Sequence, residues 1–488
     1  MIAVAPSDKT KFYTLLLAAL LSCLSFSQTA CIGNFSGDFP CDGYDLMNHF
    51  DKTTLSSKDG SDIWGWTDPS DDNEYAIVTF EDKTCFLNIT DPINPIYLGF
   101  LNSNAGENYW RDVKVYQNHA FIVADNVGAH GMQVFDLTRL RSVESPPESF
   151  AADTVLTSGW DGSTIRSCHN IVINEAKGMA YLVGCQSANG GGPIFIDISN
   201  PGSPFAVGQY SEDGYTHDAQ VVTYSGPDET HIGKEIFIGS NEDKVVIIDV
   251  TFPSNPIKIA EVSYSNSAYT HQGWFSSDMR YFLVGDERDE ISFGLNTRTV
   301  IFDFLDLDNP IYHSQYFGET EAIDHNLYIK GDLVYEANYS SGLRILDISD
   351  INDITEVGYF DTYPQNNNTS FRGAWSVYPY FDSGNIIISD INRGFFIVRE
   401  SGTLSAGDLM FNKKEAVVYP NPANEKVVVS LKNYRIKHLQ LYNILSQKIE
   451  SFEVDSLGAL SLDVSGYDEG IYILKINKEF TYKIAIKR

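Results

Sequence analysis

A short phrase recurs along most of this chain and constrains its fold more than any other feature. In each copy an apolar strand ends in Asp or Asn, one more apolar residue follows, and a turn begins. The copies lie at residues 86–92, 134–138, 195–201, 247–251, 301–304 and 345–349. Their spacing of roughly 45–60 residues fits four antiparallel strands per copy, which is typical of propeller blades. Because one such unit cannot bury both of its faces, several units must close into a ring.

Seven segments have the pattern of an innermost strand and therefore predict seven blades. In these segments apolar and polar residues alternate with a period of two, and aromatic and β-branched side chains are frequent. They start at Ile63, Trp110, His169, His217, His271, His325 and Arg372. We therefore predict an all-β chain whose main domain, residues 29–400, is a seven-bladed β-propeller.

The last predicted blade lacks a fourth strand. Its three strands lie at residues 375–378, 386–389 and 395–398, and no further strand follows directly. Met47–Asp51 has the same pattern as Val357–Asp361, the fourth strand of the preceding blade. We expect this N-terminal segment to pair with residues 395–398, which closes the ring and covers a strand edge that would otherwise attract another chain.

The N-terminus, residues 1–28, has the features of a secretory signal peptide. Lys9 and Lys11 precede an apolar run from Leu15 to Leu24, and small residues follow. The run is too short to span a membrane as a helix. Leu20–Cys23 also resembles a lipoprotein processing site, so lipidation at Cys23 is an alternative way to anchor the chain.

The cysteines fit an exported protein. Cys168 and Cys185 flank two predicted strands symmetrically about their turn, so they should face each other across a hairpin and form a disulfide. Cys31 and Cys41 are the second expected pair. Cys85 is left over and is predicted to be a buried free thiol.

The chain is strongly acidic, with a formal net charge of −31. The tail from Lys414 onward holds 11 basic and 9 acidic residues, so the acidity belongs to the body. Such a body repels phosphate backbones, which argues against nucleic acid as a partner. Two readings stay open: the charge attracts cations or basic surfaces, or it serves only solubility.

A second domain follows the ring. Residues 401–415 begin with the small-residue run Ser401–Gly407 and predict a linker. Residues 416–488 predict a separate all-β domain, with strands at residues 426–431, 438–442, 447–452, 460–463, 471–476 and 480–486.

This tail resembles the C-terminal sorting domain of type IX secretion in Bacteroidota. The matching segments are Tyr419–Ala423, Leu441–Lys448, Leu462–Gly466, Gly470–Ile476 and the basic end Lys483–Arg488. The resemblance implies a small Ig-like β-sandwich that acts as an address. It implies interaction with the type IX secretion machinery, export across both membranes, and then release or attachment at the outer surface.

The body, from about Cys31 to Glu400, resembles the choice-of-anchor B family, whose repeats are named for a Leu-Val-Ile-Val-Asp phrase. Val245–Val250 is the best copy of that phrase here. Asn88 replaces Asp in the first copy, and Arg399 replaces it in the last. The resemblance implies a secreted or surface-bound propeller but no particular reaction.

In a propeller, the loops before the innermost strands surround the central axis on one face. Polar residues at these positions predict a ligand-binding funnel. They are Arg111, Asp112, His169, Asn170, His217, Asp218, His271, Gln272, His325, Asn326 and Arg372. The loops between the second and third strands of each blade add Glu81, Asp125, Asp286, Glu287, Asn338 and Asp390.

The chemistry of this funnel has three readings. His169, His217, His271, His325 and Asp218 are candidate ligands for a transition metal. The Asp and Asn oxygens would suit Ca²⁺ instead. In the third reading each side chain only bonds the loop backbone of its own blade. Residues 286–290 are either a Ca²⁺ loop or a solvated charged loop, and the absence of a known ligand spacing favours the latter.

No phosphate loop, zinc-protease helix or nucleophile elbow is present in the sequence. The leading hypothesis is therefore an extracellular or cell-surface binding module for an unidentified ligand or protein. The rival is a metal-dependent hydrolase or oxidoreductase that uses the His-rich funnel. A third reading is a structural element of the cell envelope.

Overall fold

The computed structural model describes residues 28–185, 187–402, 416–419, 421–443, 447–477 and 480–487. The predicted signal peptide with Cys23, and nearly all of the predicted linker, lie outside these residues. The chain divides into two compact units, Met1–Ser401 and Gly402–Arg488, and each is described by itself.

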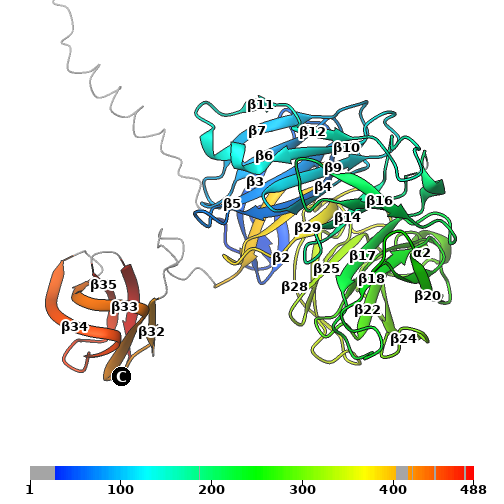
Figure 1. Cartoon of the computed structure of the whole chain (residues 1–488). Coiled ribbons are helices and arrows are strands. Elements are labelled where there is room, and N and C mark those ends of the chain that lie inside the picture. Colours follow the sequence, from blue (N-terminus) through cyan, green and yellow to red (C-terminus); the bar gives the residue numbers. More distant parts are fainter. Residues whose placement is uncertain are drawn as a thin grey trace, which may run out of the picture. The chain divides into compact units, whose positions relative to one another are not determined.

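The described part of the first unit is built around seven blades, each with four antiparallel strands (Figure 1). From innermost to outermost strand, blades 1 to 4 are β4 (Gly60–Thr67), β5 (Glu74–Phe80), β6 (Lys83–Asn88), β7 (Ile96–Asn102); β8 (Arg111–Tyr116), β9 (His119–Ala124), β10 (Met132–Asp136), β12 (Thr154–Leu156); β13 (Asn170–Asn174), β14 (Met179–Val183), β15 (Ile194–Asp197), β16 (Phe205–Gln209); and β17 (Asp218–Thr223), β18 (Glu235–Ser240), β19 (Val245–Asp249), β20 (Ile257–Val262).

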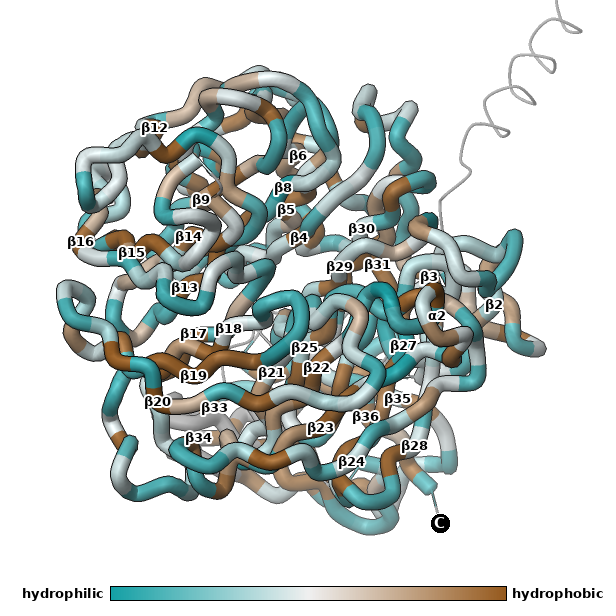
Figure 2. Tube along the Cα trace, turned by 90° about the vertical axis from the view of Figure 1, so that its right-hand side faces the viewer, coloured by the Kyte–Doolittle hydropathy of each residue, from teal (hydrophilic) through white to brown (hydrophobic). Residues whose placement is uncertain are grey.

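Blades 5 to 7 follow the same order: β21 (Thr270–Phe275), β22 (Tyr281–Asp286), β23 (Arg298–Asp303), β24 (Ile311–Phe317); β25 (Asn326–Lys330), β26 (Leu333–Ala337), β27 (Leu343–Asp347), β28 (Thr355–Phe360); and β29 (Ala374–Tyr378), β30 (Ile386–Asp390), β31 (Gly394–Glu400), β3 (Tyr44–Phe50). The innermost strands contact one another in succession, and β29 returns to β4. The view down the ring shows them surrounding its centre (Figure 2). The predicted seven-bladed propeller is confirmed.

The recurring Asp or Asn ends the third strand of each of the first six blades and starts a turn. In each case its side chain accepts a hydrogen bond from the backbone N–H two residues later, as with Asp249 Oδ1 and Thr251 N at 3.0 Å. The other five residues are Asn88, Asp136, Asp197, Asp303 and Asp347. In blade 4 the apolar residue between Asp249 and Thr251 is Val250, which is fully buried. Its backbone N–H donates to the carbonyl oxygen of Glu235 on the second strand, β18. The phrase repeats because every blade needs the same side-chain-capped turn.

Both faces of each sheet are buried against neighbouring blades. Ile171 on β13 belongs to the core between blades 2 and 3, while the next residue, Val172, belongs to the core between blades 3 and 4. The two-residue period of a strand sends alternate side chains to opposite faces. Because both faces are covered, the strands are apolar along most of their length.

The N-terminal strand β3 closes the ring. It pairs antiparallel with β31, with His49 opposite Phe396 and Phe50 opposite Phe395. Met47 is 3% exposed and packs in the core between blades 7 and 1. The predicted closure is therefore confirmed.

Two outer edges carry strands that the sequence pattern did not predict. β2 (Phe39–Asp42), held to β1 (Phe35–Ser36), pairs with β28 of blade 6, and the Cys31–Cys41 disulfide ties down this segment. β11 (Glu148–Phe150) runs parallel to β7 of blade 1. Both cover strand edges that would otherwise be exposed. Among the described residues, three short helices also connect strands: η1 (Leu137–Ser142), η2 (Asn189–Gly191) and α2 (Asp289–Phe293).

The second predicted disulfide, Cys168–Cys185, is also present. Asn170 pairs with Val183 in the β13–β14 hairpin, so continuing that register outward places the two cysteines opposite each other. Cys85 is a fully buried free thiol, as expected.

The second unit is an antiparallel β-structure with five strands among its described residues: β32 (Ala416–Tyr419), β33 (Lys426–Asn443), β34 (Lys448–Asp463), β35 (Gly470–Ile476) and β36 (Phe480–Ile486). The first part of β33 pairs with β32, and its last part pairs with β35. Val427 and Leu441, from these two parts, share one core. Six separate strands were predicted for this unit. Instead, β33 and β34 each cover two of the predicted strands, and their pairing shifts in register where a turn was expected.

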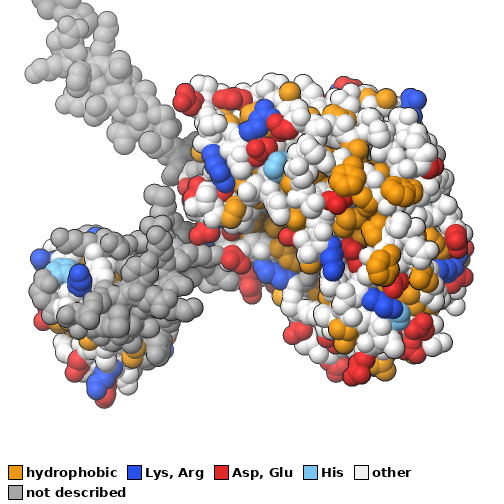
Figure 3. Space-filling view, viewed as in Figure 1, with side chains coloured by type: hydrophobic (Ala, Val, Ile, Leu, Met, Phe, Trp, Pro, Cys, Tyr) orange, Lys and Arg blue, Asp and Glu red, His pale blue; other side chains and the backbone are white. Residues whose placement is uncertain are grey.

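Charge on the first unit is mixed. On the face shown in Figure 3, acidic and basic side chains are interspersed, and hydrophobic side chains gather on one part. No described helix has the length and apolar character needed to cross a membrane.

Candidate functional site

Two cavities lie one above the other where the innermost strands meet. The outer one, here called the funnel, has a volume of about 550 Å³, and the inner one of about 10 Å³ has room for roughly one water molecule. The same four histidines border both cavities: His169, His217, His271 and His325. They therefore form the partition between the funnel and the interior.

These histidines are linked from blade to blade. His169, His217 and His325 directly precede the innermost strand of their blades, and His271 is the second residue of its strand. Successive ring centroids are 4.2–4.4 Å apart. Nδ1 of His217 lies 3.0 Å from the carbonyl oxygen of His271, and Nδ1 of His271 lies 3.1 Å from that of His325. Nδ1 of His325 lies 2.6 Å from the carbonyl oxygen of Trp375. The backbone bonds predicted within each blade thus run to the next blade instead.

The bonding pattern fixes the tautomer of three imidazoles. A carbonyl oxygen only accepts, so Nδ1 carries the proton and Nε2 keeps a free electron pair. Burial, followed by neighbouring imidazoles, lowers the pKa of His217 and His271 well below the ordinary value. Burial also lowers the pKa of His325 to about 3. These rings are therefore neutral metal-ligand candidates at neutral pH.

Glu287 completes a group of three donors in the funnel, here called the His₂Glu group. Its Oε1 lies 4.0 Å from Nε2 of His271 and 3.7 Å from Nε2 of His325. The ligand atoms of all three residues lie within 4.8 Å of one another. Burial raises the pKa of Glu287 to about 7, although the hydroxyl of Tyr339 donates to Oε1 at 2.6 Å.

Tyr339 reaches Glu287 from a strained backbone. Its φ is +31°, which a residue with a bulky side chain rarely adopts. Gly373 lies so close that a Cβ there would meet the Tyr339 carbonyl oxygen at 2.1 Å. Strain of this kind concentrates at functional sites, because the surrounding structure must hold the residue in place.

Aromatic side chains wall the funnel above the His₂Glu group, and sequence reasoning missed them. They are Tyr109, Trp110, Tyr269, Tyr339, Phe371 and Trp375. A signal was available, because Tyr215-Thr216-His217 and Tyr269-Thr270-His271 repeat an aromatic residue two positions before the histidine. Rings facing polar groups across a concave space are typical of small-molecule sites.

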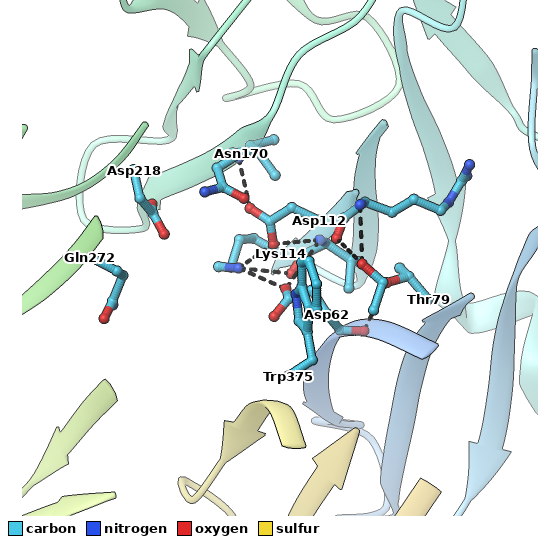
Figure 4. Close-up of polar contacts among 12 residues, drawn as sticks. Asp62, Thr79, Asp112, Lys114, Asn170, Asp218, Gln272 and Trp375 are labelled. Carbon is cyan, nitrogen blue, oxygen red and sulfur yellow. Dashed lines mark hydrogen bonds and ion pairs between the residues drawn. The ribbon is translucent and has the colours of Figure 1, made fainter. Parts of the chain in front are cut away.

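A buried charge network of Lys114, Asp112 and Asp62 lines the inner cavity (Figure 4). Lys114 Nζ lies 2.5 Å from Asp112 Oδ1 and 3.1 Å from Asp62 Oδ2. Asp112 Oδ2 also accepts the Ile171 N–H of the next blade at 2.7 Å. Burial raises the pKa of Asp218, on the far side of the inner cavity, to about 7. Lys114 and Asp62 were not anticipated from the sequence.

The residues predicted to line one funnel fall into three groups. The four histidines and Arg372 line the outer funnel, whereas Asp112, Asn170, Asp218 and Asn326 line only the inner cavity. Gln272 bonds the backbone N–H and carbonyl of Leu327 and lines neither. Arg111 also lines neither, because its guanidinium bonds Ser103 and His130 away from the axis.

Among the six loop residues, Glu287 alone borders the funnel. Asp125 accepts a hydrogen bond from His169 Nδ1 at 3.1 Å, and Asp390 accepts one from Thr362. Residues 286–290 were read as a solvated charged loop, which is wrong for most of them. Asp286, Asp289 and Glu290 are at most 3% exposed, because the loop folds inward between blades 5 and 6.

The candidate metal ligands separate in the same way. His271 and His325 meet Glu287, whereas His169, His217 and Asp218 belong to no such group of three within the described residues. Of the candidate transition-metal ligands, the structure thus brings His271 and His325 together with a carboxylate.

Two families match parts of the chain. Residues 417–487 match the secretion system C-terminal sorting domain, and residues 188–212 and 325–362 match the LVIVD repeat. The chain therefore carries LVIVD repeats within its propeller and a type IX secretion sorting domain at its C-terminal end. This exported propeller is directed to the cell surface or the extracellular space, and its tail interacts with the type IX secretion machinery. No curated protein matches the chain.

Solved structures offer only weak likenesses to the LVIVD-repeat propeller. A functionally unknown protein from Desulfotomaculum acetoxidans is 15% identical, with 64% of this chain and 88% of that chain covered and a TM-score of 0.45. PorZ, a surface component of the type IX secretion system of Porphyromonas gingivalis, is 11% identical, with 85% and 58% covered and a TM-score of 0.44. The Cps50 (Swd1) propeller domain of Myceliophteria thermophila is 8% identical, with 73% and 98% covered and a TM-score of 0.47. Because these three TM-scores are below 0.5, the fold assignment rests on the seven sheets themselves.

Proposed function

We propose that the exported propeller is a binding module whose funnel captures an extracellular ligand with the help of a transition metal on the His₂Glu group. The observation that carries this proposal is the convergence of His271, His325 and Glu287 at the floor of a 550 Å³ aromatic-walled cavity. Imidazole and carboxylate donors suit Zn²⁺ and similar ions.

The geometry around the donors supports metal binding. Histidine ligands usually donate their second ring N–H to a carbonyl, and His271 and His325 do so at 3.1 and 2.6 Å. The Tyr339 hydroxyl orients Glu287 in the same manner. Two donors on one Zn²⁺ are about 3–4 Å apart, so closing the present separations needs movements of about 1 Å or less.

The funnel above the group supports ligand capture. Trp110, Tyr269 and Trp375 offer flat apolar surfaces, while Arg372 adds a positive charge at the same wall. A ligand with a ring and an anionic or metal-binding group would use both features. Three protein donors leave a zinc coordination position free for such a group.

The test is zinc titration of purified full-length protein by calorimetry, with Glu287→Gln as the diagnostic variant. This change keeps the size of the side chain and removes the charged donor. Zn²⁺ should bind wild type at about one ion per chain and bind Glu287→Gln at least about tenfold more weakly. The exposed Glu242→Gln is the matched control and should bind as wild type does. Equal affinity in all three proteins would refute the proposed site.

A metal-dependent hydrolase is the second candidate. The same donor set with an open position is typical of catalytic zinc, which lowers the pKa of a bound water. Zinc-dependent turnover of a simple activated ester, lost in Glu287→Gln, would favour this candidate. Zinc binding without any turnover would favour the binding module. Absence of both would leave a structural role in the envelope.

A further inference from the structure

Three carboxyl groups are buried together between blades 5 and 6. Asp289 and Glu290 begin α2, and Asp324 comes from the loop before β25. Their residues are 0%, 3% and 4% exposed. One oxygen from each lies within 4.8 Å of the others. This group is here called the carboxylate cluster, and none of its members borders the funnel or the inner cavity.

Most oxygens of the carboxylate cluster have no protein partner. Among the described residues, both oxygens of Asp324, Oδ1 of Asp289 and Oε2 of Glu290 accept no hydrogen bond. Arg298 Nε donates to Asp289 Oδ2 at 2.6 Å, and the Asp324 N–H donates to Glu290 Oε1 at 3.3 Å. A buried polar atom without a partner is costly, and a buried charge more so.

The nearby carboxylate of Asp286, by contrast, has hydrogen-bond donors from the protein. It accepts hydrogen bonds from the Tyr264 hydroxyl and from the N–H groups of Ala268 and Tyr269, at 2.7–2.8 Å. These donors come from the segment between β20 and β21, and no such donor is directed at either carboxylate oxygen of Asp324.

The backbone beside Asp324 makes room for its carboxylate. A Cβ on Gly285 would lie 2.0 Å from Asp324 Oδ2, so any other residue there would push the carboxylate away. Asp324 arrives from a different blade than Asp289 and Glu290, and it enters this space with both oxygens unpartnered.

We propose that the carboxylate cluster binds a Ca²⁺ ion through Asp289, Glu290 and Asp324. Ca²⁺ prefers six to eight oxygen ligands at 2.3–2.6 Å, so two ligands of one ion lie at most about 4.6–5.2 Å apart. The three oxygens of the carboxylate cluster lie within 4.8 Å of one another and therefore meet this limit. Arg298 forms an ion pair with Asp289 and lies 3.8 Å from Asp286, but it forms none with Glu290 or Asp324 among the ion pairs of the described residues. A divalent cation would neutralise the remaining negative charge. Mg²⁺ demands shorter bonds and usually keeps several waters, which a buried cluster does not suit.

The competing state is a cluster without an ion in which the carboxyl groups share protons. Burial and the nearby charge of Asp286 raise the pKa of Asp289 to about 7, and burial and the charge of Asp289 raise the pKa of Glu290 to about 8. Partial protonation at neutral pH is therefore the alternative way to relieve the charge. The two states can be distinguished, because the ion-bound state depends on Ca²⁺ and the protonated state does not.

A bound ion would fix the positions of residues in the neighbouring His₂Glu group. Glu287 lies two residues before Asp289, and His325 directly follows Asp324. An ion would thus fix the loop and the strand that carry two members of the His₂Glu group. The inference does not rest on the proposed function, because it stands on the carboxylate cluster alone.

The test uses full-length protein. Because the cluster is buried, the ion should survive purification, and elemental analysis should find about one Ca²⁺ per chain. Unfolding and refolding in EGTA should lower the melting temperature, and Ca²⁺ but not Mg²⁺ should restore it. Asp324→Asn should lose the Ca²⁺ dependence, while the exposed Asp332→Asn should retain it.

Two results would overturn the inference. One is a melting temperature of wild-type protein that is the same in EGTA and Ca²⁺, with no bound ion. The other is a full complement of Ca²⁺ in Asp324→Asn. If Asp324→Asn does not fold, the wild-type series decides alone. Glu287→Gln should keep its Ca²⁺, which separates failure at this cluster from failure at the His₂Glu group.

Discussion

The imidazole of His217 in blade 4 donates its Nδ1–H to the backbone carbonyl of His271 in blade 5, at 3.0 Å. His271 and His325 repeat the bond into blades 6 and 7. The histidines therefore join blades near the axis, in addition to isolated backbone bridges such as Tyr339–Ala374 between blades 6 and 7. They also leave every Nε2 free for a ligand.

His217→Ala tests the joining role, because His217 lies outside the His₂Glu group. The change removes a buried hydrogen bond and leaves the His271 carbonyl without its partner, which costs about 1–3 kcal/mol of unfolding free energy. Chemical denaturation measures the loss. His119→Ala is the control, since that imidazole bonds its own turn at Gln117. Equal stability of both variants would show that the bond between blades contributes nothing.

Replacement of residues 44–50 by a Gly/Ser segment should open the ring. It removes the fourth strand of blade 7 and the buried Met47, whose side chain alone is worth about 2–5 kcal/mol. The freed β31 edge should also promote aggregation, which light scattering detects. The same replacement at residues 148–150 removes only the added edge strand β11 and should have a much smaller effect. A monomeric, equally stable first variant would contradict the closure.

Removal of the Cys168–Cys185 disulfide by Cys168→Ser and Cys185→Ser should lower the unfolding free energy by about 3 kcal/mol, because the cross-link restricts the unfolded chain. The denaturant midpoint measures this change. The same measurement on Cys31→Ser with Cys41→Ser compares the effect of a disulfide within a blade hairpin with that of a disulfide in the N-terminal segment at the edge of blade 6. No shift for the first pair would mean that the hairpin register alone holds the loop.

Cys85 should not react with a thiol reagent in the native protein. It is fully buried, and burial raises its pKa to about 11, although Tyr97 and Ser57 contact the sulfur. The reactive thiolate is therefore scarce below about pH 10 and inaccessible besides. Labelling at pH 8 should need denaturant. Rapid labelling of folded protein at that pH would show that blade 1 opens readily.

Local patterns in the sequence settle the number of blades and their closure. The two-residue alternation and the Asp-capped turn depend only on residues that are close in the sequence. The turn formed by Asp249 and Thr251, like its counterparts in other blades, can therefore be predicted from the sequence. The disulfide at Cys168 and Cys185 follows from hairpin symmetry for the same reason. The resemblance of the tail to a sorting domain likewise resides in short motifs in order.

The site required the tertiary structure, because its residues come from different blades. Sequence reasoning placed His169, His217, His271 and His325 at equivalent positions, but only side-chain direction selects two of them to meet Glu287. Arg111 occupied the same kind of position and turns away toward His130. The carboxylate cluster joins residues from two blades, and its burial depends on how the loop folds inward. Strand period and turn chemistry are local properties and can be derived from sequence, whereas convergence on one point depends on ring closure and rotamers across the whole propeller.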